Sequence, residues 1–205
     1  MSSHLYESYH LRCSELSQLM EQYNGSSEDA KKLRGAIASE LLRQELGRYL
    51  VEHGKPLKIS AVNSYIAGSK FEYDLLVVKS DADAYMGLVY RPEDVVAVIE
   101  SKAGGLFDVD ADTSKIARAA NRAIELNSDI CFGYITMFEN VPVHIFKKNG
   151  EATVKHWDLT NQYLMEKING KCAIYAVTLH RGKQLHDPGS DQEFEDFASM
   201  LIGEA

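Results

Sequence analysis

The sequence predicts a single-domain α/β protein in which helices flank one central mixed β-sheet. The chain has 205 residues, which is enough for one domain with a full hydrophobic core. Short valine-rich runs, typical of buried strands, alternate along it with longer segments that carry helix start and stop signals. No stretch has the composition of a repeat, a low-complexity segment or a domain linker. Strands and helices mixed in this order favour one α/β domain.

Two helices are predicted in the N-terminal quarter. The first ends at an Asn-Gly pair, so residues 1–25 are expected to form an N-terminal helix that precedes the domain at 26–205. The second helix begins at capping serines followed by acidic residues, and it ends at Gly54. Polar and apolar residues then alternate over 57–67, which predicts a strand.

Two valine-rich runs, 71–79 and 95–99, come next. They are too short for typical helices, so we interpret them as consecutive strands joined by the polar connector 80–93. Beyond them the pattern predicts a helix at 112–126, strands at 130–138 and 143–157 with a hairpin turn at Asn149-Gly150, a short helix at 161–167, a strand at 171–180 and a last helix from about residue 190.

Composition restricts the classes of protein that the chain can belong to. The net charge of −8 gives no support to non-specific nucleic-acid binding, although phosphate contacts depend on local clusters of cations and not on the total. Cys13, Cys131 and Cys172 have no metal-ligand spacing and are expected to be reduced, partly buried thiols. The sequence contains no apolar run long enough for a membrane span and no signal-peptide core, so we expect a cytoplasmic protein without a membrane partner.

The apolar run "VVAVIESKAGG" ends abruptly in Glu100, Ser101 and Lys102. If the strands on either side of the connector pair as an antiparallel ladder centred at Gly87, Asp74 lies opposite Glu100. Because residues two apart share a face, Lys102 then projects from the same face as both carboxylates. The same register pairs Leu76 with Val98 and Val78 with Val96.

Opposed Cβ atoms in such a ladder are about 5 Å apart, a separation at which two carboxylates can share one divalent cation. The alternative is a solvated strand end with a cross-strand salt bridge. The tripeptide D/E-x-K alone does not decide between them, because it occurs again at Asp29-Ala30-Lys31, where a helix is expected to start. Only the strand context and the paired Asp74 distinguish the first copy.

Asp74 followed by Glu100-Ser101-Lys102 resembles the signature of the PD-(D/E)XK superfamily, the restriction-endonuclease-like nucleases. The sequence is similar to a little-characterised microbial branch of that fold, with the core motif region at 35–147. Tyr73 stands where the motif loosely keeps a proline, and no glutamine follows Lys102 at the two-residue offset common in some branches.

The resemblance implies a site residue by residue. Asp74 and Glu100 match the metal ligands, Lys102 the catalytic lysine, and Glu40 the helix carboxylate that many members add. Magnesium, or manganese, prefers oxygen ligands and keeps several waters, so the backbone carbonyl of Ser101 completes a plausible ligand set. Glu40 and Glu45 are otherwise interpreted as solvated helix charges, with Glu45 on a different side of the helix from Glu40.

Basic residues recur at helical spacing directly after this motif. Lys115, Arg118 and Arg122 are candidates for contact with a nucleic-acid backbone, and Lys70 belongs to a looser second set with Lys55 and Lys58. The alternative is an ordinary solvated helix face.

The resemblance thus implies a Mg²⁺-dependent endonuclease, a phosphodiester hydrolase that acts on DNA. A non-catalytic nucleic-acid- or protein-binding subunit on the same fold is the main alternative. An enzyme that uses the two carboxylates as acid and base on a small molecule is a third, for which no pocket is identified. A homodimer is one of the oligomeric states left open.

Overall fold

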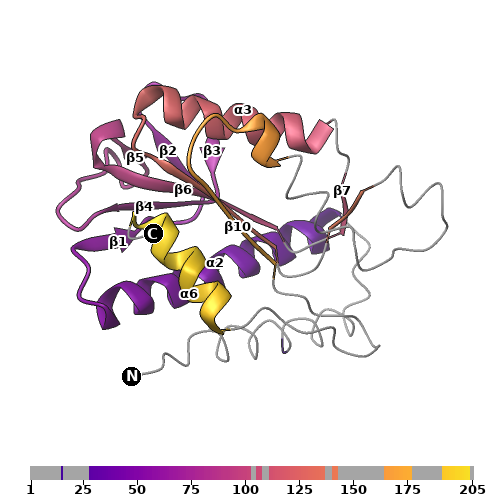
Figure 1. The fold of residues 1–205 in the computed structure, drawn as a ribbon, viewed down its shortest axis with the longest axis horizontal. Coiled ribbons are helices and arrows are strands. Elements are labelled where there is room, and N and C mark those ends of the chain that lie inside the picture. The colour runs from indigo at the N-terminus through magenta and orange to yellow at the C-terminus, as the bar shows by residue number, and fades with distance from the viewer. Residues whose placement is uncertain are drawn as a thin grey trace.

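The computed structural model describes residues 15, 28–102, 105–107, 111–136, 140–142, 164–176 and 191–203. A mixed five-stranded sheet, in the order β1-β4-β6-β8-β10, forms the centre of the fold, and helices lie on both of its faces (Figure 1). The predicted α/β class with a central mixed sheet is therefore confirmed. Apart from residue 15, the predicted N-terminal helix lies outside the described residues, as does the predicted strand pair at 143–157.

The central sheet changes from antiparallel to parallel pairing at β6. β4 pairs antiparallel with both β1 and β6, whereas β8 pairs parallel with both β6 and β10. Parallel neighbours need a crossover connection, and helix α3 (Ala111–Leu126) is the helix between β6 and β8. The strands are β1 (Leu57–Ile59), β4 (Leu75–Lys79), β6 (Val95–Lys102), β8 (Cys131–Thr136) and β10 (Cys172–Ala176).

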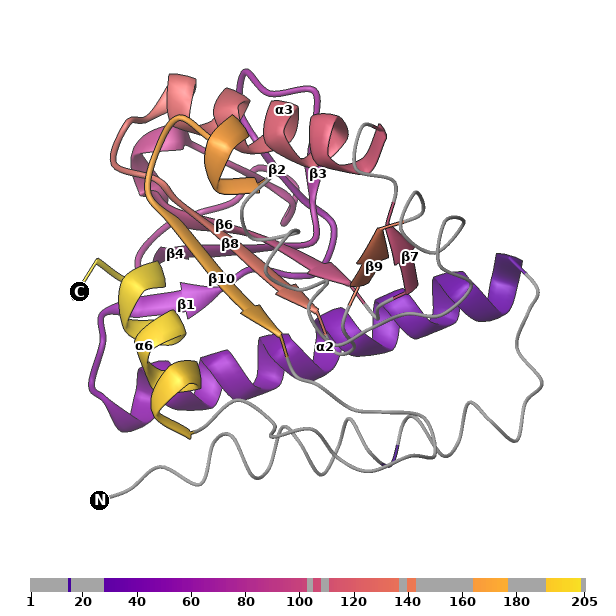
Figure 2. The ribbon, with the colours of Figure 1, turned by 45° about the vertical axis from the view of Figure 1, so that its right-hand side comes forward.

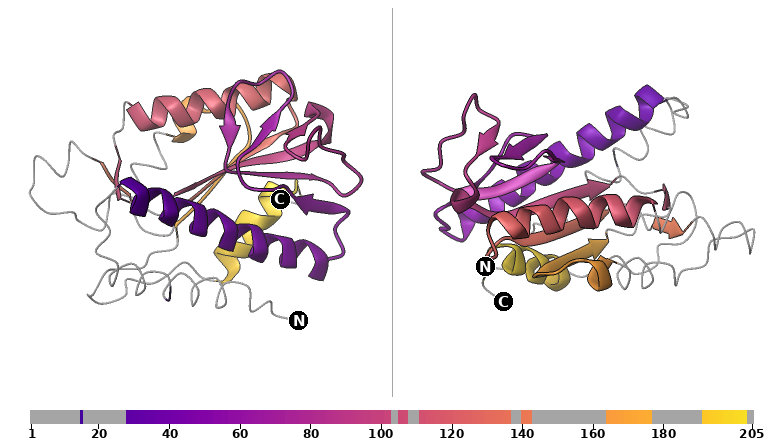
Figure 3. Two further views of the ribbon diagram at one scale, coloured as in Figure 1. Left: turned by 180° about the vertical axis from the view of Figure 1, so that it is seen from behind. Right: turned by 90° about the horizontal axis from the view of Figure 1, so that it is seen from above.

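The helices form two layers, one on each side of the sheet. Figures 2 and 3 show α2 (Glu28–Glu52) and α6 (Asp191–Leu201) on one face and α3 on the opposite face. Two separate hydrophobic clusters correspond to these layers. Leu42 of α2 packs with Ile99 in the first, and Ala120 of α3 packs with Val98 in the second; all four are at most 1% exposed. Burial of a leucine of this kind contributes about 1.5–3 kcal/mol to the free energy of unfolding.

Several predicted elements are found close to their expected positions. Helix α2 ends beside Gly54, whose φ of +60° favours glycine, and the N–H of Lys55 donates to the carbonyl of Leu50 to close the last turn. The last helix begins at Asp191, and the helix predicted at 161–167 is helical at 164–167. Cys131 is buried and Cys172 half-buried, and both are free thiols.

Two predicted strands are each divided in the structure. The segment 57–67 contains β1 and a separate strand β2 (Ser64–Ile66), because Asn63 adopts a φ of +59° and turns the chain between them. The segment 71–79 contains β3 (Glu72–Tyr73) and β4, interrupted at Asp74.

Three short strands within the described residues were not predicted. β5 (Val89–Tyr90) lies in the expected connector, just before a 3-10 turn η1 (Pro92–Asp94), and joins β3 and β2 in a three-stranded sheet ordered β3-β2-β5. β7 (Gly105–Phe107) and β9 (Asn140–Pro142) pair in parallel as a two-stranded sheet.

The predicted register of β4 and β6 is correct at one end and wrong at the other. Leu76 pairs with Val98 as expected, but Val78 pairs with Val95 and not with Val96, because the register shifts between Val77 and Val78. This irregularity places Val95 in the cluster under α3 and Val96 against the cluster under α2. The shift lies at the far end of the ladder from Asp74, so it leaves the charged end in the expected register.

No helix in the described part of the chain is long and apolar enough to cross a membrane.

Candidate active site

The charged groups predicted from the sequence lie together where β4 begins and β6 ends. Leu75 pairs with Ile99 at this end of the β4–β6 ladder, so Asp74 and Glu100 are the next residue of each strand. The Lys102 ammonium donates to Glu100 Oε1, and its Nζ lies 4.0 Å from Asp74 Oδ2. One lysine therefore bridges two carboxylates that come from neighbouring strands.

Asp74 occupies a break between two strands. If the β4–β6 register continued, Ser101 would pair with Tyr73, but Tyr73 belongs to β3 in the other sheet. The backbone N–H of Ser101 donates instead to Asp74 Oδ2 at 2.8 Å, so the carboxylate replaces the missing strand as its acceptor. Asp74 Oδ1 has no hydrogen-bond partner within the described residues.

The backbone of Ser101 contributes a further oxygen on the same side. In an extended strand the N–H and C=O of one residue point toward the same neighbour, so the Ser101 carbonyl also points toward Asp74. Its side chain points toward the opposite face of the sheet, and its buried Oγ has no hydrogen-bond partner in the described part of the structure. The carbonyl, and not the hydroxyl, is therefore the group available at the site.

Burial and like charge raise the pKa of Asp74 to about 6. Burial is the larger cause and the Glu100 carboxylate the second, while Lys102 and the Ser101 N–H act in the opposite direction. The side chains of Asp74 and Glu100 are 25% and 19% exposed, so both carboxylates are partly buried but reachable. A divalent cation between them would remove the repulsion, and this donor set fits Mg²⁺, which takes one or two carboxylates and keeps several waters.

The structure does not bring Glu40 to this pair. Its carboxylate receives two hydrogen bonds from Arg43 and one from Gln44, all within α2. These contacts, with the hydrogen bond from Arg43 as the main cause, lower the pKa of Glu40 to about 2. Within the described residues, no group of three or more His, Cys, Asp or Glu side chains is placed to hold a metal ion. The two carboxylates of Asp74 and Glu100 thus form the acidic part of the site without Glu40.

Glu45 lies on the buried side of α2, contrary to its interpretation as a solvated helix charge. Its side chain is only 2% exposed, and it forms an ion pair with Arg48 one helical turn away. Leu42 and Tyr49 on the same side of the helix are also buried, which accounts for its position.

Two buried polar residues of β8 lie beside the site and were missed from the sequence. Tyr134 pairs with Glu100 and Thr136 pairs with Lys102, and both side chains are completely buried. The alternation of strand faces could have placed them there, but only if the parallel pairing of β6 and β8 had been known. Both residues therefore lie on the strand next to the charged groups.

The four predicted cationic contacts lie on α3 and on the β2–β3 turn. Lys115 and Arg118 of α3 are exposed, as is Lys70 in the turn. Arg122 is partly engaged, since it donates to the carbonyl of Gly68 at 2.8 Å and to Glu125 at 3.0 Å. The Gly68 contact attaches the turn that carries Lys70 to α3, whereas Lys58 of the same predicted set donates to the carbonyl of Ala82.

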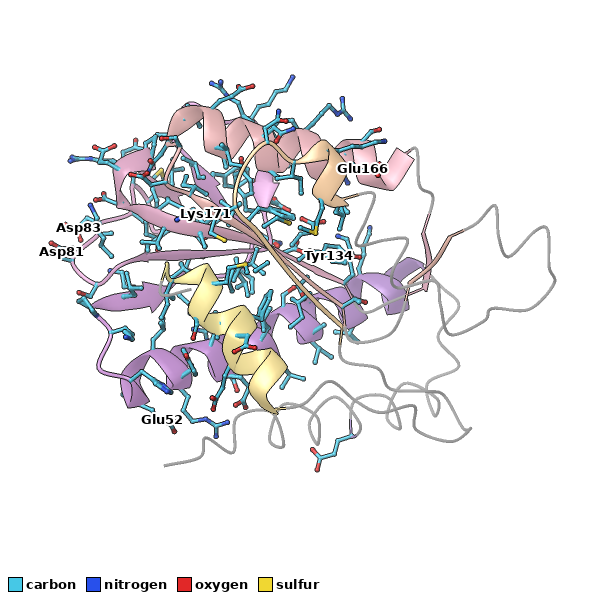
Figure 4. All side chains as sticks on the ribbon, viewed as in Figure 1. Glu52, Asp81, Asp83, Tyr134, Glu166 and Lys171 are labelled. Atoms are coloured by element: carbon cyan, nitrogen blue, oxygen red, sulfur yellow. The ribbon has the colours of Figure 1, made fainter. Side chains whose placement is uncertain are left out.

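The cavity that the described residues line does not include the carboxylate pair. This open cavity of about 250 Å³ lies at the other end of β4, beyond Lys79. Figure 4 shows Asp81 and Asp83, two of its lining residues, far from Tyr134, which pairs with Glu100. The cavity and the charged site are therefore separate.

No family model matches the chain, and no curated protein sequence matches it either.

Proposed function

We propose that the protein is a Mg²⁺- or Mn²⁺-dependent nuclease of the restriction-endonuclease-like type that hydrolyses phosphodiester bonds of DNA. The convergence of Asp74, Glu100 and Lys102 at one end of an antiparallel strand pair carries the proposal. It is the arrangement that the resemblance to the PD-(D/E)XK pattern implies. The exposed cations of α3 and the β2–β3 turn are the groups that would contact the nucleic-acid backbone.

Each residue has a distinct role in this proposal. Asp74 and Glu100, with the Ser101 carbonyl, would hold the cation, which polarises the phosphate and lowers the pKa of a bound water. Lys102, which forms an ion pair with Glu100 in the structure, would orient the attacking water and stabilise developing negative charge. Partial burial of the two carboxylates strengthens these interactions relative to bulk water.

The test is cleavage of single-stranded, duplex and branched DNA and RNA in Mg²⁺ and in Mn²⁺. We expect cleavage by the wild type, and a loss of at least about 100-fold in both Asp74→Asn and Lys102→Ala, the scale of removing one charge-stabilising group. Preference for DNA over RNA in the same panel would support the substrate class. Equal activity in wild type and both variants would contradict the assigned site.

Two matched variants control for charge and fold. Glu72→Gln removes an exposed carboxylate two residues before Asp74. This carboxylate accepts a hydrogen bond from the Tyr65 hydroxyl. Lys31→Ala alters the second D-x-K copy, which lies in helix α2 and not at a strand end. Both should cleave like the wild type. Circular dichroism of every variant separates loss of activity from loss of fold.

A non-catalytic nucleic-acid-binding subunit is the second candidate, and one observation favours it. The Lys102 ammonium and the Glu100 carboxylate neutralise each other without a metal ion, as they would at a strand end with a purely structural role. In that case the protein would bind nucleic acid without cleaving it, and Mg²⁺ would not raise its affinity above that in EDTA. Electrophoretic mobility shifts in the two buffers distinguish the candidates.

A further inference from the structure

Tyr73 joins the start of the candidate site to helix α3. Its ring is buried, with 2% exposure, and its hydroxyl donates to the backbone carbonyl of Ala119 at 3.1 Å. The same hydroxyl lies 3.0 Å from Ser69 Oγ, in the β2–β3 turn. A single phenol oxygen therefore connects β3, its turn and the middle of α3.

Asp74 follows Tyr73 directly and is held by few backbone contacts of its own. It belongs to neither β3 nor β4, and its carbonyl accepts one hydrogen bond, from Asn63 N–H at 3.1 Å. Its carboxylate accepts the Ser101 N–H. On the N-terminal side, the nearest side chain fixed by buried contacts is that of Tyr73, so displacement of Tyr73 would be transmitted to Asp74 through one peptide unit.

We propose that Tyr73 is a positioning residue for Asp74, and that its hydroxyl sets the separation between the Asp74 and Glu100 carboxylates. The proposal deepens the proposed metal-dependent nuclease function and rests on it for its effect on metal binding. Residues that orient a metal ligand in this way typically change metal affinity by about 10–100-fold when they are altered.

Tyr73→Phe is the test variant, because it removes the hydroxyl and keeps the buried ring. Tyr49→Phe is its matched control. The Tyr49 hydroxyl also joins two elements, since it lies 3.2 Å from Ser199 Oγ of α6, but it belongs to the cluster under α2. Both variants should lower the melting temperature to a similar extent. Only Tyr73→Phe should affect Asp74.

Two measurements are needed, one with metal and one without. By isothermal titration with Mn²⁺ alone, we expect Tyr73→Phe to lose about 10-fold in affinity and Tyr49→Phe to match the wild type. By ¹H–¹⁵N NMR in EDTA, we expect the Ser101 amide proton, which donates to Asp74, to shift upfield in Tyr73→Phe only.

The outcomes separate this proposal from the proposed function. An unchanged Ser101 amide in Tyr73→Phe overturns the positioning role, whatever the metal measurements give. Equal losses of Mn²⁺ affinity in both tyrosine variants overturn it too, because the effect would then be one of general stability. A shifted Ser101 amide in a protein whose wild type binds no Mn²⁺ supports the positioning of Asp74 and overturns the nuclease proposal alone.

Discussion

Ionisation of the Asp74 carboxyl is unfavourable in the folded protein. Its pKa rises to about 6, chiefly because the side chain is buried and secondly because Glu100 is close. Between the ordinary pKa of 3.8 and about 6, the folded protein therefore holds more protons than the unfolded chain. The free energy of unfolding of the metal-free protein must fall as pH rises through this window.

The pH dependence gives a direct prediction for Asp74→Asn, which cannot ionise. In EDTA the variant should gain stability relative to the wild type between pH 4 and pH 7.5, by an amount approaching 3 kcal/mol for a shift of about two pH units. Urea unfolding at the two pH values measures the change. Glu93→Gln, in which an exposed carboxylate is lost from the η1 turn, serves as the control. An identical difference between wild type and Asp74→Asn at both pH values would contradict the raised pKa.

The backbone and the side chain of Ser101 have different roles in the structure. Its Oγ is buried without a hydrogen-bond partner in the described residues, whereas its N–H donates to Asp74. Ser101→Ala should therefore raise the free energy of unfolding by about 1 kcal/mol, since an unsatisfied buried hydroxyl is destabilising. Mn²⁺ affinity should be unchanged. Reduced affinity in this variant would show that the hydroxyl, and not the carbonyl, serves the site.

Sequence alone could place some residues of the site and not others. Glu100 and Lys102 share a face by simple alternation, and the symmetric register about Gly87 places Asp74 opposite Glu100. The contacts of Tyr73 with Ala119 and of Arg122 with Gly68 could not be predicted. They depend on how α3 lies across the three-stranded sheet β3-β2-β5, which no local sequence pattern indicates.

At the scale of elements, the strands that were predicted wrongly are those that the backbone interrupts. Asn63 divides one segment through a left-handed conformation that asparagine tolerates, and Asp74 divides another at the candidate site itself. The apolar alternation continues across both breaks, so it indicates one strand where the structure has two. The shift between Val77 and Val78 has the same effect on register.

Helix α6 is held against β8 at a strand glycine, which leads to a prediction at this scale. A Cβ added to Gly133 would lie 2.5 Å from Leu201 Cδ2, and Leu201 is only 1% exposed. Gly133→Ala should lower the free energy of unfolding by about 1–3 kcal/mol through overpacking. In a Leu201→Ala background the same substitution should be neutral or stabilising, because it fills the space that is left.

A double-mutant cycle in urea measures this coupling. Gly47→Ala, at a glycine of α2 with no atom within 4 Å of the added Cβ, is the control. It should be neutral or slightly stabilising, because alanine has the higher helix propensity. Additive effects of Gly133→Ala and Leu201→Ala would show that α6 does not pack on β8 as described.

The whole molecule was the most predictable level, because independent signals agreed. Helix caps, valine-rich runs and connector lengths all pointed to a central sheet between helical layers, and the five-stranded sheet has that arrangement. Which strands pair with one another in the sheet was harder to predict from the sequence. Nothing local indicated that β6 and β8 are parallel neighbours, so Tyr134 and Thr136 were missed beside Glu100 and Lys102.

Stability of the whole fold should respond to metal if the two strands that supply the carboxylates are joined by a cation. A ligand at 100 times its dissociation constant stabilises the folded state by about 2.7 kcal/mol. For a chain of this length each kcal/mol raises the melting temperature by about 2–4 °C, so saturating Mn²⁺ should raise that of the wild type by about 5–10 °C. Differential scanning fluorimetry with Mn²⁺ and with EDTA measures the shift. Glu72→Gln should keep it and Asp74→Asn should lose it. An equal shift in Asp74→Asn would mean that the metal binds elsewhere, and the junction of β4 and β6 would then be an ion-paired strand end that serves the fold alone.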